Sequence, residues 1–164
     1  MKRILVIGCP GSGKSTFARE LSRIYGIEVC HLDNLYWNAD KTTVEKGVFL
    51  ERLGKEMEKE SLIVDGNFSS TMDMRMSWCD TVFFLDLSAD ICLESVRGRR
   101  GKARTDIPWI ETEEDEEFMQ FIKSFNDLRR PAILELIEKH KKDTVVFTSR
   151  TEVNEYLYRL ENKQ

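Results

Sequence analysis

The segment from Gly8 to Thr16 has the residue types and the spacing of a phosphate-binding loop. It reads Gly8-Cys9-Pro10-Gly11-Ser12-Gly13-Lys14-Ser15-Thr16 and fits the pattern G-x-x-x-x-G-K-[ST]. Glycines allow backbone amides to touch an anion, and a helix that begins within the loop directs the positive end of its dipole at the same point. We therefore predict that this loop binds the phosphates of ATP, although a glycine-rich turn with an accidental lysine would have the same composition.

The polar side chains of the loop have separate expected roles. Lys14 is expected to bridge the β- and γ-phosphates, and Ser15 to place its hydroxyl on Mg²⁺. Thr16 is expected to contact the α-phosphate side of the nucleotide. Cys9 occupies a variable position of the pattern, and we interpret it as a spacer.

Two aspartates are predicted to stand at the carboxyl ends of parallel strands, the edge at which open α/β sheets bind ligands. Asp33 follows the apolar run of residues 27–32, and Asp65 follows that of residues 62–64. We expect Asp33 to orient or deprotonate the hydroxyl of a phosphoryl acceptor, and Asp65 to support the shell of Mg²⁺. A helix cap or loop solvation is the alternative for both. Asp86 has the same placement, but we interpret it as part of a turn.

A basic segment, residues 97–104, concentrates five cations in eight positions of a chain whose net charge is −4. Its glycines predict a mobile lid, over about residues 97–112, that folds over ATP and excludes water. In it we expect Arg99 and Arg104 to stabilise the transferring phosphoryl group and Arg97 to contact ATP. In the alternative, the basic segment is solvated and pairs with the acidic run of residues 111–117.

Other side chains are predicted to line the site of an acceptor, in part within an insertion over about residues 34–60. The aromatic candidates, on which a base or a sugar could stack, are Tyr36, Trp37 and Phe68. The cationic candidates for an acceptor phosphate are Arg75, Arg129 and Arg130. The aromatic residues could equally belong to the core, and the arginines to the surface. The two histidines, His31 and His140, show no partner pattern and are given no catalytic role.

Five short apolar runs without polar alternation predict strands that are buried on both faces. The runs are residues 3–7, 27–32, 62–64, 81–85 and 144–147. Because helical patterns separate them, we predict a doubly wound α/β fold, in which helices cover both faces of a five-stranded parallel sheet in three layers.

Helix boundaries are predicted from caps and from helical periodicity. The first helix follows Gly13 and stops at Gly26, residues 42–45 form a capping box, and Ser88 and Thr151 are N-caps. Further helices are expected over residues 70–78, 89–100, 118–125 and 131–140.

The composition excludes several classes of protein. At 164 residues, 41% of them hydrophobic and 33% charged, the chain matches a single domain, residues 1–164, with a packed core. Its apolar runs are far shorter than the about 20 residues of a bilayer span, so we expect no membrane partner and a cytoplasmic location. Nucleic acid is an unfavourable partner for a chain with a net charge of −4 and a pI of about 5.4. The four cysteines show no zinc spacing and are expected to be reduced, and the sequence does not indicate an oligomeric state.

With these segments the chain resembles P-loop kinases of the nucleoside-monophosphate kinase fold. It most closely resembles the adenylate-kinase-related proteins known as DNA topology modulation proteins. The resemblance covers nearly the whole chain. The segments that carry it are residues 8–16, 31–37, 64–68 with Arg75, 84–87, and Arg99 with the arginines on either side of it.

The resemblance implies a P-loop NTPase fold with the sheet order 2-3-1-4-5, ATP with Mg²⁺ as cofactors, and a lid that closes over the donor. It also implies that Asn67 belongs to the acceptor site and that adenine packs near residues 148–151, with Arg150 as a contact. Two features depart from the family pattern. Ser95 stands where such relatives commonly carry an arginine, and the short lid lacks the zinc-binding cysteines of longer adenylate kinases, which argues against a structural metal.

Together these features predict an ATP-dependent phosphotransferase that acts on a small molecule, with a nucleoside or a nucleoside monophosphate as the first choice. In-line transfer would rely on positioning and charge rather than on a covalent intermediate. One alternative is a regulatory protein that uses ATP as a switch, without a small-molecule acceptor. Another is an ATPase without any acceptor.

Overall fold

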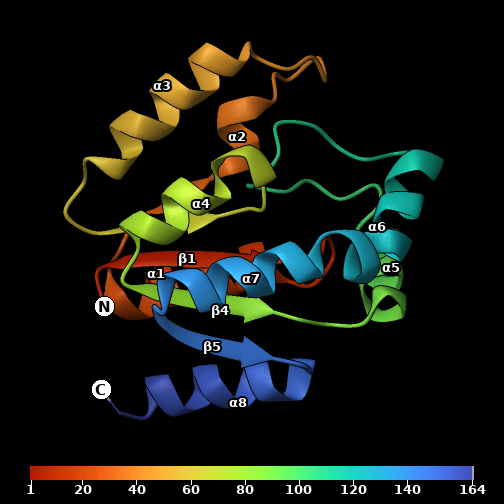
Figure 1. Ribbon diagram of the computed structural model, residues 1–164. Coiled ribbons are helices and arrows are strands. Elements are labelled where there is room, and N and C mark those ends of the chain that lie inside the picture. Colours follow the sequence, from red (N-terminus) through yellow and green to blue (C-terminus); the bar gives the residue numbers. More distant parts are fainter. Residues whose placement is uncertain (164) are drawn as a thin grey trace.

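The computed structural model describes residues 1–163 and contains one sheet with the strand order β2-β3-β1-β4-β5 (Figure 1). The strands are β1 (Arg3–Gly8), β2 (Val29–His31), β3 (Leu62–Asp65), β4 (Thr81–Leu85) and β5 (Asp143–Phe147). All neighbouring strands are parallel, and Ile4 of β1 lies opposite Ile63 of β3 and Thr81 of β4. The predicted α/β fold and strand order are confirmed, although β2 is shorter than the apolar run that predicted it.

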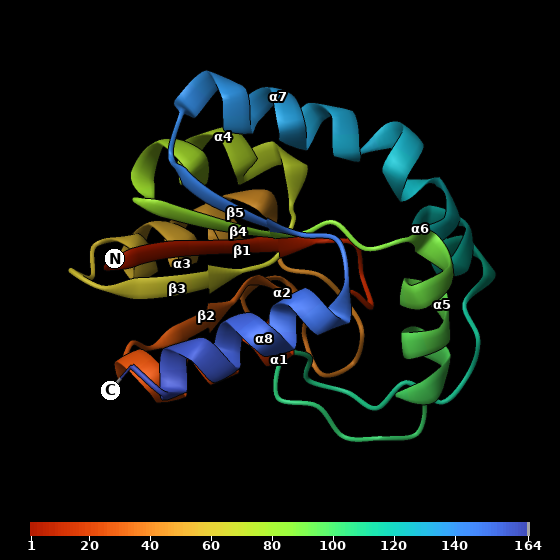
Figure 2. The ribbon, with the colours of Figure 1, turned by 90° about the horizontal axis from the view of Figure 1, so that it is seen from below.

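Helices cover both faces of this sheet. Figure 2 shows α1 and α8 on one side of it and α4 and α7 on the other. As predicted, α1 ends at Gly26, which is left-handed (φ 66°), and the Ser88 hydroxyl caps α5. The helices of the described chain are α1 (Lys14–Tyr25), α2 (Leu32–Tyr36), α3 (Lys46–Met57), α4 (Ser69–Trp78), α5 (Ala89–Gly98), α6 (Glu116–Leu128), α7 (Arg130–His140) and α8 (Arg150–Glu161).

Two hydrophobic cores fill the space between the sheet and the helices. Ile4 and Val6 of β1 belong to the core that includes Phe17 of α1, whereas Leu5 and Ile7 belong to the core formed with α3 to α7. All four strand residues are fully buried. Because helices cover both faces, the central strands need no polar face, and this explains why their sequences do not alternate.

Two of the predicted helix starts are wrong. The amide and the hydroxyl of Thr42 both donate to Asp40 Oδ1, over 2.9 and 2.6 Å. This tight turn uses the hydroxyl that a capping box would need, and α3 begins only at Lys46. The last helix is capped by the Ser149 hydroxyl rather than by Thr151.

The carboxyl ends of the strands meet at one edge of the sheet. There β1 runs into the segment before α1, β2 runs into α2, and β3 runs into the segment before α4. The irregular segment between α5 and α6 reaches toward α2 (Figure 1), where the Thr105 carbonyl accepts a hydrogen bond from Asn34 Nδ2 (2.8 Å). All four cysteines, Cys9 included, are free and buried. No helix within residues 1–163 has the length and apolar character of a membrane span.

Candidate active site

The turn between β1 and α1 is shaped for an anion. The Ser12 amide donates to the Cys9 carbonyl (2.9 Å), and Gly13 precedes α1 in a left-handed conformation (φ 94°) with no side-chain cap. Gly11 has a φ of 86°, and a Cβ at this position would lie 2.3 Å from the Cys92 carbonyl oxygen. The backbone therefore requires glycine at both positions, and it presents the first N–H groups of α1 to a ligand.

Arg150, the first residue of α8, contacts this loop. Its guanidinium donates to the carbonyl oxygens of Gly11 (3.1 Å) and Ser12 (3.4 Å), and it also contacts the Ser95 hydroxyl. Ser95 stands where the kinases that this chain resembles commonly carry an arginine. The structure thus brings an arginine from a different helix to the neighbourhood of that position.

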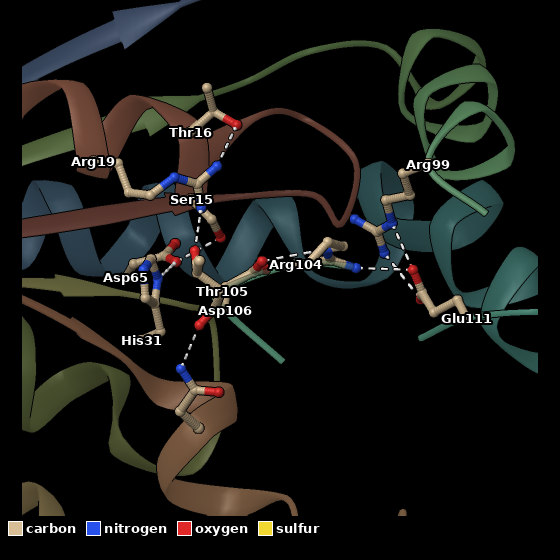
Figure 3. Close-up of polar contacts among 11 residues, drawn as sticks. Ser15, Thr16, Arg19, His31, Asp65, Arg99, Arg104, Thr105, Asp106 and Glu111 are labelled. Carbon is tan, nitrogen blue, oxygen red and sulfur yellow. Dashed lines mark hydrogen bonds and ion pairs between the residues drawn. The ribbon is translucent and has the colours of Figure 1, made fainter. Parts of the chain in front are cut away.

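Asp65, the last residue of β3, lies beside the hydroxyl of Ser15 (Figure 3). Ser15 Oγ donates to Asp65 Oδ2 over 2.6 Å, and His31 Nδ1 lies 2.6 Å from the same oxygen. Asp65 is only 3% exposed, and its Oδ1 has no hydrogen-bond partner within the described chain. A hydroxyl and a carboxylate oxygen with free lone pairs are oxygen ligands suited to Mg²⁺, so these residues fit the ion that accompanies ATP.

The same residues do not form a complete metal cage. Residues 1–163 contain no cluster of three or more His, Cys, Asp or Glu side chains that could hold a metal ion. This agrees with Mg²⁺ chemistry at nucleotide sites, where one or two protein ligands act together with phosphate oxygens and water.

His31 belongs to this polar group although the sequence analysis gave it no role. It is the last residue of β2, and it pairs in register with Asp65 of β3. The signal that could have found it is its position near the carboxyl end of the predicted strand over residues 27–32, at the same sheet edge that selected both aspartates.

Asp33 lies in the first turn of α2 and lines a cavity together with Lys14. Burial raises the pKa of the Asp33 carboxyl, the charge of Lys14 opposes this rise, and the charges of Asp65 and Asp106 add to it. A carboxyl with a raised pKa is a better proton acceptor than an ordinary aspartate. The arrangement therefore suits Asp33 to accept a proton from a hydroxyl group bound in the cavity.

Two cavities meet at Lys14. The first, of about 510 Å³, lies between the phosphate-binding loop and the lid segment and is also lined by Gly11, Gly13, Ser15, Thr16 and Arg150. The second, of about 1210 Å³, lies next to α2 and the loop after β3. Lys14, Arg99 and Arg104 line both cavities. Two ligands bound in these cavities would therefore share the same cations.

Within the lid, the arginines that line the cavities are paired with acidic residues (Figure 3). Glu111 accepts hydrogen bonds from Arg99 Nε (2.9 Å) and from Arg104 Nη1 (2.8 Å). Arg104 also forms an ion pair with Asp106, which is 3% exposed. Burial opposes ionisation of Asp106, but the hydrogen bond and charge of Arg104 outweigh it and lower the pKa of this carboxyl.

The pairing of basic and acidic segments, which the sequence offered as an alternative, is present in the structure. Besides Glu111, Glu114 pairs with both Arg97 (3.4 Å) and Arg100 (2.9 Å). Arg97 is not among the residues that line either cavity. The structure therefore brings Arg99 and Arg104 to the site, but it does not bring Arg97 there.

Thr105 anchors the lid segment to the rest of the site. Its hydroxyl accepts a hydrogen bond from Arg19 of α1 (3.2 Å), and its carbonyl accepts one from Asn34 of α2. Sequence reasoning missed Thr105 and Asp106, because an irregular segment has no periodicity that shows which of its side chains turn inward. It also missed Arg19 of α1, because its contact with Thr105 joins residues far apart in the sequence.

The predicted aromatic residues line the second cavity and also pack on one another. Tyr36 and Phe68 lie edge to face, with 5.0 Å between ring centroids, and Trp37 meets Trp109 of the lid in the same way at 5.2 Å. Asn67 also lines this cavity, and its amide bonds to both the N–H (3.2 Å) and the carbonyl (2.7 Å) of Gly8. The aromatic residues thus serve both the cavity wall and the edge of the core, and Asn67 fixes the end of β1.

Of the three arginines predicted for an acceptor phosphate, the structure brings one to the cavity. Arg75 is fully buried and donates to the carbonyl oxygens of Gly66, Asn67 and Phe68, so it holds the loop after β3 instead of contacting a ligand. Arg130 forms a two-pronged ion pair with Asp86 (2.8 Å), which also gives Asp86 a role beyond a turn. Arg129 lines the second cavity, with its guanidinium 5.5 Å from the centre of the Phe121 ring.

Three solved structures that share this fold are kinases. A shikimate kinase from Bacteroides thetaiotaomicron superposes with a TM-score of 0.65 at 20% identity, covering 99% of this chain and 97% of that one. A shikimate kinase from Acinetobacter baumannii in complex with shikimate gives a TM-score of 0.62 at 17% identity, covering 100% and 95%. A deoxyadenosine kinase from M. mycoides with bound dATP gives 0.54 at 15% identity, covering 98% and 100%. At these identities the likeness shows the fold.

Sequence comparison places the chain in a broad family. Among curated protein sequences, none matches this chain. A family model described as an AAA domain matches residues 4–120, a span that contains the phosphate-binding loop, both aspartates and the whole lid. Because this match covers more than half of the sequence, the chain belongs to the AAA domain family that the model describes.

Proposed function

We propose that this protein is a P-loop kinase that transfers the γ-phosphoryl group of Mg-ATP to a small-molecule acceptor. The observation that carries the proposal is the junction of two cavities at Lys14, with Ser15 in the first and Asp33 in the second. A nucleotide switch or an ATPase would need the first cavity alone. A second cavity that ends at the same lysine favours transfer between two bound molecules.

On the donor side, the backbone of residues 8–16 would bind the phosphates, and Lys14 would bridge the β- and γ-phosphates. Ser15 and Asp65 would hold Mg²⁺, which when bound neutralises charge on the phosphate oxygens. The first cavity extends to Arg150, which supports the placement of the nucleoside part of ATP beside residues 148–151.

On the acceptor side, Asp33 would orient the attacking hydroxyl and take its proton. The raised pKa of its carboxyl and its place in the same cavity as Lys14 support this role. The proton would then leave the hydroxyl as its oxygen bonds to phosphorus, and the bond from phosphorus to the bridging oxygen of ADP would break.

The lid would act on both ligands. Arg99 and Arg104 line both cavities, so they would stabilise the charge on the phosphoryl group as it passes from one ligand to the other. To bind phosphate oxygens, Arg99 and Arg104 must break their hydrogen bonds with Glu111. The acceptor-binding insertion would comprise about residues 34–60, and the lid about residues 97–112.

The walls of the second cavity favour a nucleoside or a nucleoside monophosphate. Tyr36, Trp37 and Trp109 offer ring faces and edges to a planar base, and Arg129 offers a guanidinium to an anionic group. Among the structurally similar proteins, one is a deoxyadenosine kinase and one was solved with shikimate. A phosphate on the acceptor would use Arg129, and a base would use the aromatic wall, so a nucleoside monophosphate fits both.

The test is ADP release from Mg-ATP against a panel of nucleosides, nucleoside monophosphates and small hydroxylated acids. We expect one acceptor class to raise the rate, and Lys14→Ala to abolish the increase. Lys123→Ala, at an exposed lysine of α6, is the matched control and should behave like the wild type. Tight ATP binding without stimulated turnover would contradict the proposal and favour a regulatory ATP-binding protein.

A further inference from the structure

One oxygen of the Asp65 carboxylate receives two hydrogen bonds, and the other receives none. Ser15 Oγ and His31 Nδ1 both lie 2.6 Å from Oδ2. Oδ1 is buried and has no partner within the described residues. This asymmetry needs a reason, because buried carboxylate oxygens are usually hydrogen-bonded.

The two partners of Oδ2 come from different parts of the fold. Ser15 belongs to the first turn of α1, whereas His31 ends β2, the strand next to β3. The His31 side chain is 10% exposed and that of Asp65 is 3% exposed, so water does not compete freely for this contact. The histidine therefore contacts Asp65 from the neighbouring strand, separately from the nucleotide loop.

The contact has a defined chemical direction. An ionised carboxylate only accepts hydrogen bonds, so the imidazole nitrogen that faces it, Nδ1, must carry a proton. Two donors on one oxygen fix the rotation of the carboxylate and leave the lone pairs of Oδ1 unused. Without His31, the carboxylate could turn and present either oxygen to Ser15.

We propose that His31 is a positioning residue that fixes the rotation of the Asp65 carboxylate, so that Oδ2 stays on the Ser15 hydroxyl and the two side chains are oriented together for Mg²⁺. His31 acts through Asp65 and does not itself touch the nucleotide. The inference rests on the proposed function in one respect, the binding of Mg²⁺ with the nucleotide at Ser15 and Asp65. Partners that orient metal-binding groups typically contribute about 10- to 100-fold to metal affinity.

The experiment measures ADP binding by calorimetry at a series of Mg²⁺ concentrations and in EDTA. We expect His31→Ala to weaken the Mg²⁺-dependent part of the ADP affinity by about 10- to 100-fold and to leave the affinity in EDTA within about twofold. His31→Asn, whose amide nitrogen can stand near the place of Nδ1, should recover most of the loss. His31→Gln, whose amide reaches further, should not recover it.

The chain offers a matched control. His140 Nε2 lies 2.6 Å from Asp73 Oδ1, so it forms a second histidine–aspartate pair, but this aspartate is 59% exposed and its partners are Lys139 and His140 rather than the Ser15 hydroxyl. His140→Ala should leave the Mg²⁺ dependence of ADP binding unchanged. If His31→Ala does not fold, the comparison of His31→Asn with His31→Gln gives the same answer.

Two results would overturn the inference. One is an unchanged Mg²⁺ dependence in His31→Ala, and the other is an equal loss of ADP affinity with and without Mg²⁺, which would mark a merely structural contact. The proposed function fails in a different way. In that case the wild type does not bind ADP more tightly with Mg²⁺, or Lys14→Ala binds ADP as the wild type does.

Discussion

The phosphate-binding edge, where Ser15, His31 and Asp65 meet, and the lid hold their charged groups by different means. At the edge, His31 and Asp65 are fixed by the register of two neighbouring strands, and Ser15 comes from the helix that follows β1. In the lid, Arg99 and Arg104 are held by Glu111, a side chain of the same segment. Strand register is set before any ligand arrives, whereas an ion pair can exchange its acid for a phosphate. We therefore expect a change at Asp33, beside this edge, to alter the chemical step, and a change in the lid to alter the affinity for ATP as well.

The largest effect is expected at Asp33. Asp33→Asn removes the proton acceptor but keeps the size of the side chain, so kcat should fall by about 10²- to 10⁴-fold. The affinity for ATP should change little, because Asp33 lines only the second cavity. Steady-state kinetics with the identified acceptor, together with ATP binding by calorimetry, measure both quantities. A large loss of ATP affinity would show that Asp33 belongs to the donor site instead.

The pH dependence of the wild type sharpens this prediction. Burial raises the pKa of Asp33 above the ordinary value for aspartate of 3.8. Transfer should therefore fall as the pH drops through this raised pKa, and Asp33→Asn should lose that acid limb. The folded state also favours the protonated carboxyl, so Asp33 contributes stability at low pH that is lost as the pH rises through its folded pKa. Urea unfolding at neutral pH should accordingly find Asp33→Asn at least as stable as the wild type.

In the lid, Arg104→Ala should lower kcat/KM by about 10²- to 10³-fold, because it removes a cation that lines both cavities. The loss should include a higher KM for ATP, unlike the loss at Asp33. Arg97→Ala is the comparison within the same segment. It should change kcat/KM by less than about threefold, since Arg97 lines neither cavity and pairs with Glu114 in an exposed ion pair. Equal effects of the two variants would mean that the lid contributes only its overall charge.

A further prediction concerns the stability of the loop after β3. Arg75→Ala would leave three carbonyl oxygens of the loop after β3 without their donor, at a cost of about 2–4 kcal/mol in the free energy of unfolding. Arg130→Ala, which breaks an ion pair whose arginine is 40% exposed, should cost less than about 1 kcal/mol. Urea unfolding measures both. If Arg75→Ala instead raised the KM of the acceptor without loss of stability, Arg75 would be a ligand contact after all.

The same contrast explains how much the sequence could predict. The phosphate-binding loop and the two aspartates follow from a motif and from predicted strand ends, which are local patterns. The sheet order follows from a family resemblance that covers nearly the whole chain. The partners of Arg75, Arg129 and Arg130 are not local, because a guanidinium can reach a carbonyl, a ring or a carboxylate depending on which helix packs beside it. For the same reason the burial of Asp106 follows from the path of an irregular loop and has no sequence signal.

The smallest effect, and the most direct test of the contrast, is expected from Glu111→Gln. Glu111 occupies N–H groups of Arg99 and Arg104 that phosphate oxygens would need, so ATP binding has to break these ion pairs. Glutamine keeps the shape of the side chain but removes its charge, and the Kd for ATP should therefore fall by about 3- to 10-fold, or up to about 1.4 kcal/mol. Glu114→Gln is the control, because Glu114 is more exposed and one of its two partners lies away from the cavities, and its Kd should stay within about twofold of the wild type. If Glu111→Gln binds ATP more weakly, then Glu111 orders the lid for binding instead of competing with phosphate, and the lid is as fixed as the edge.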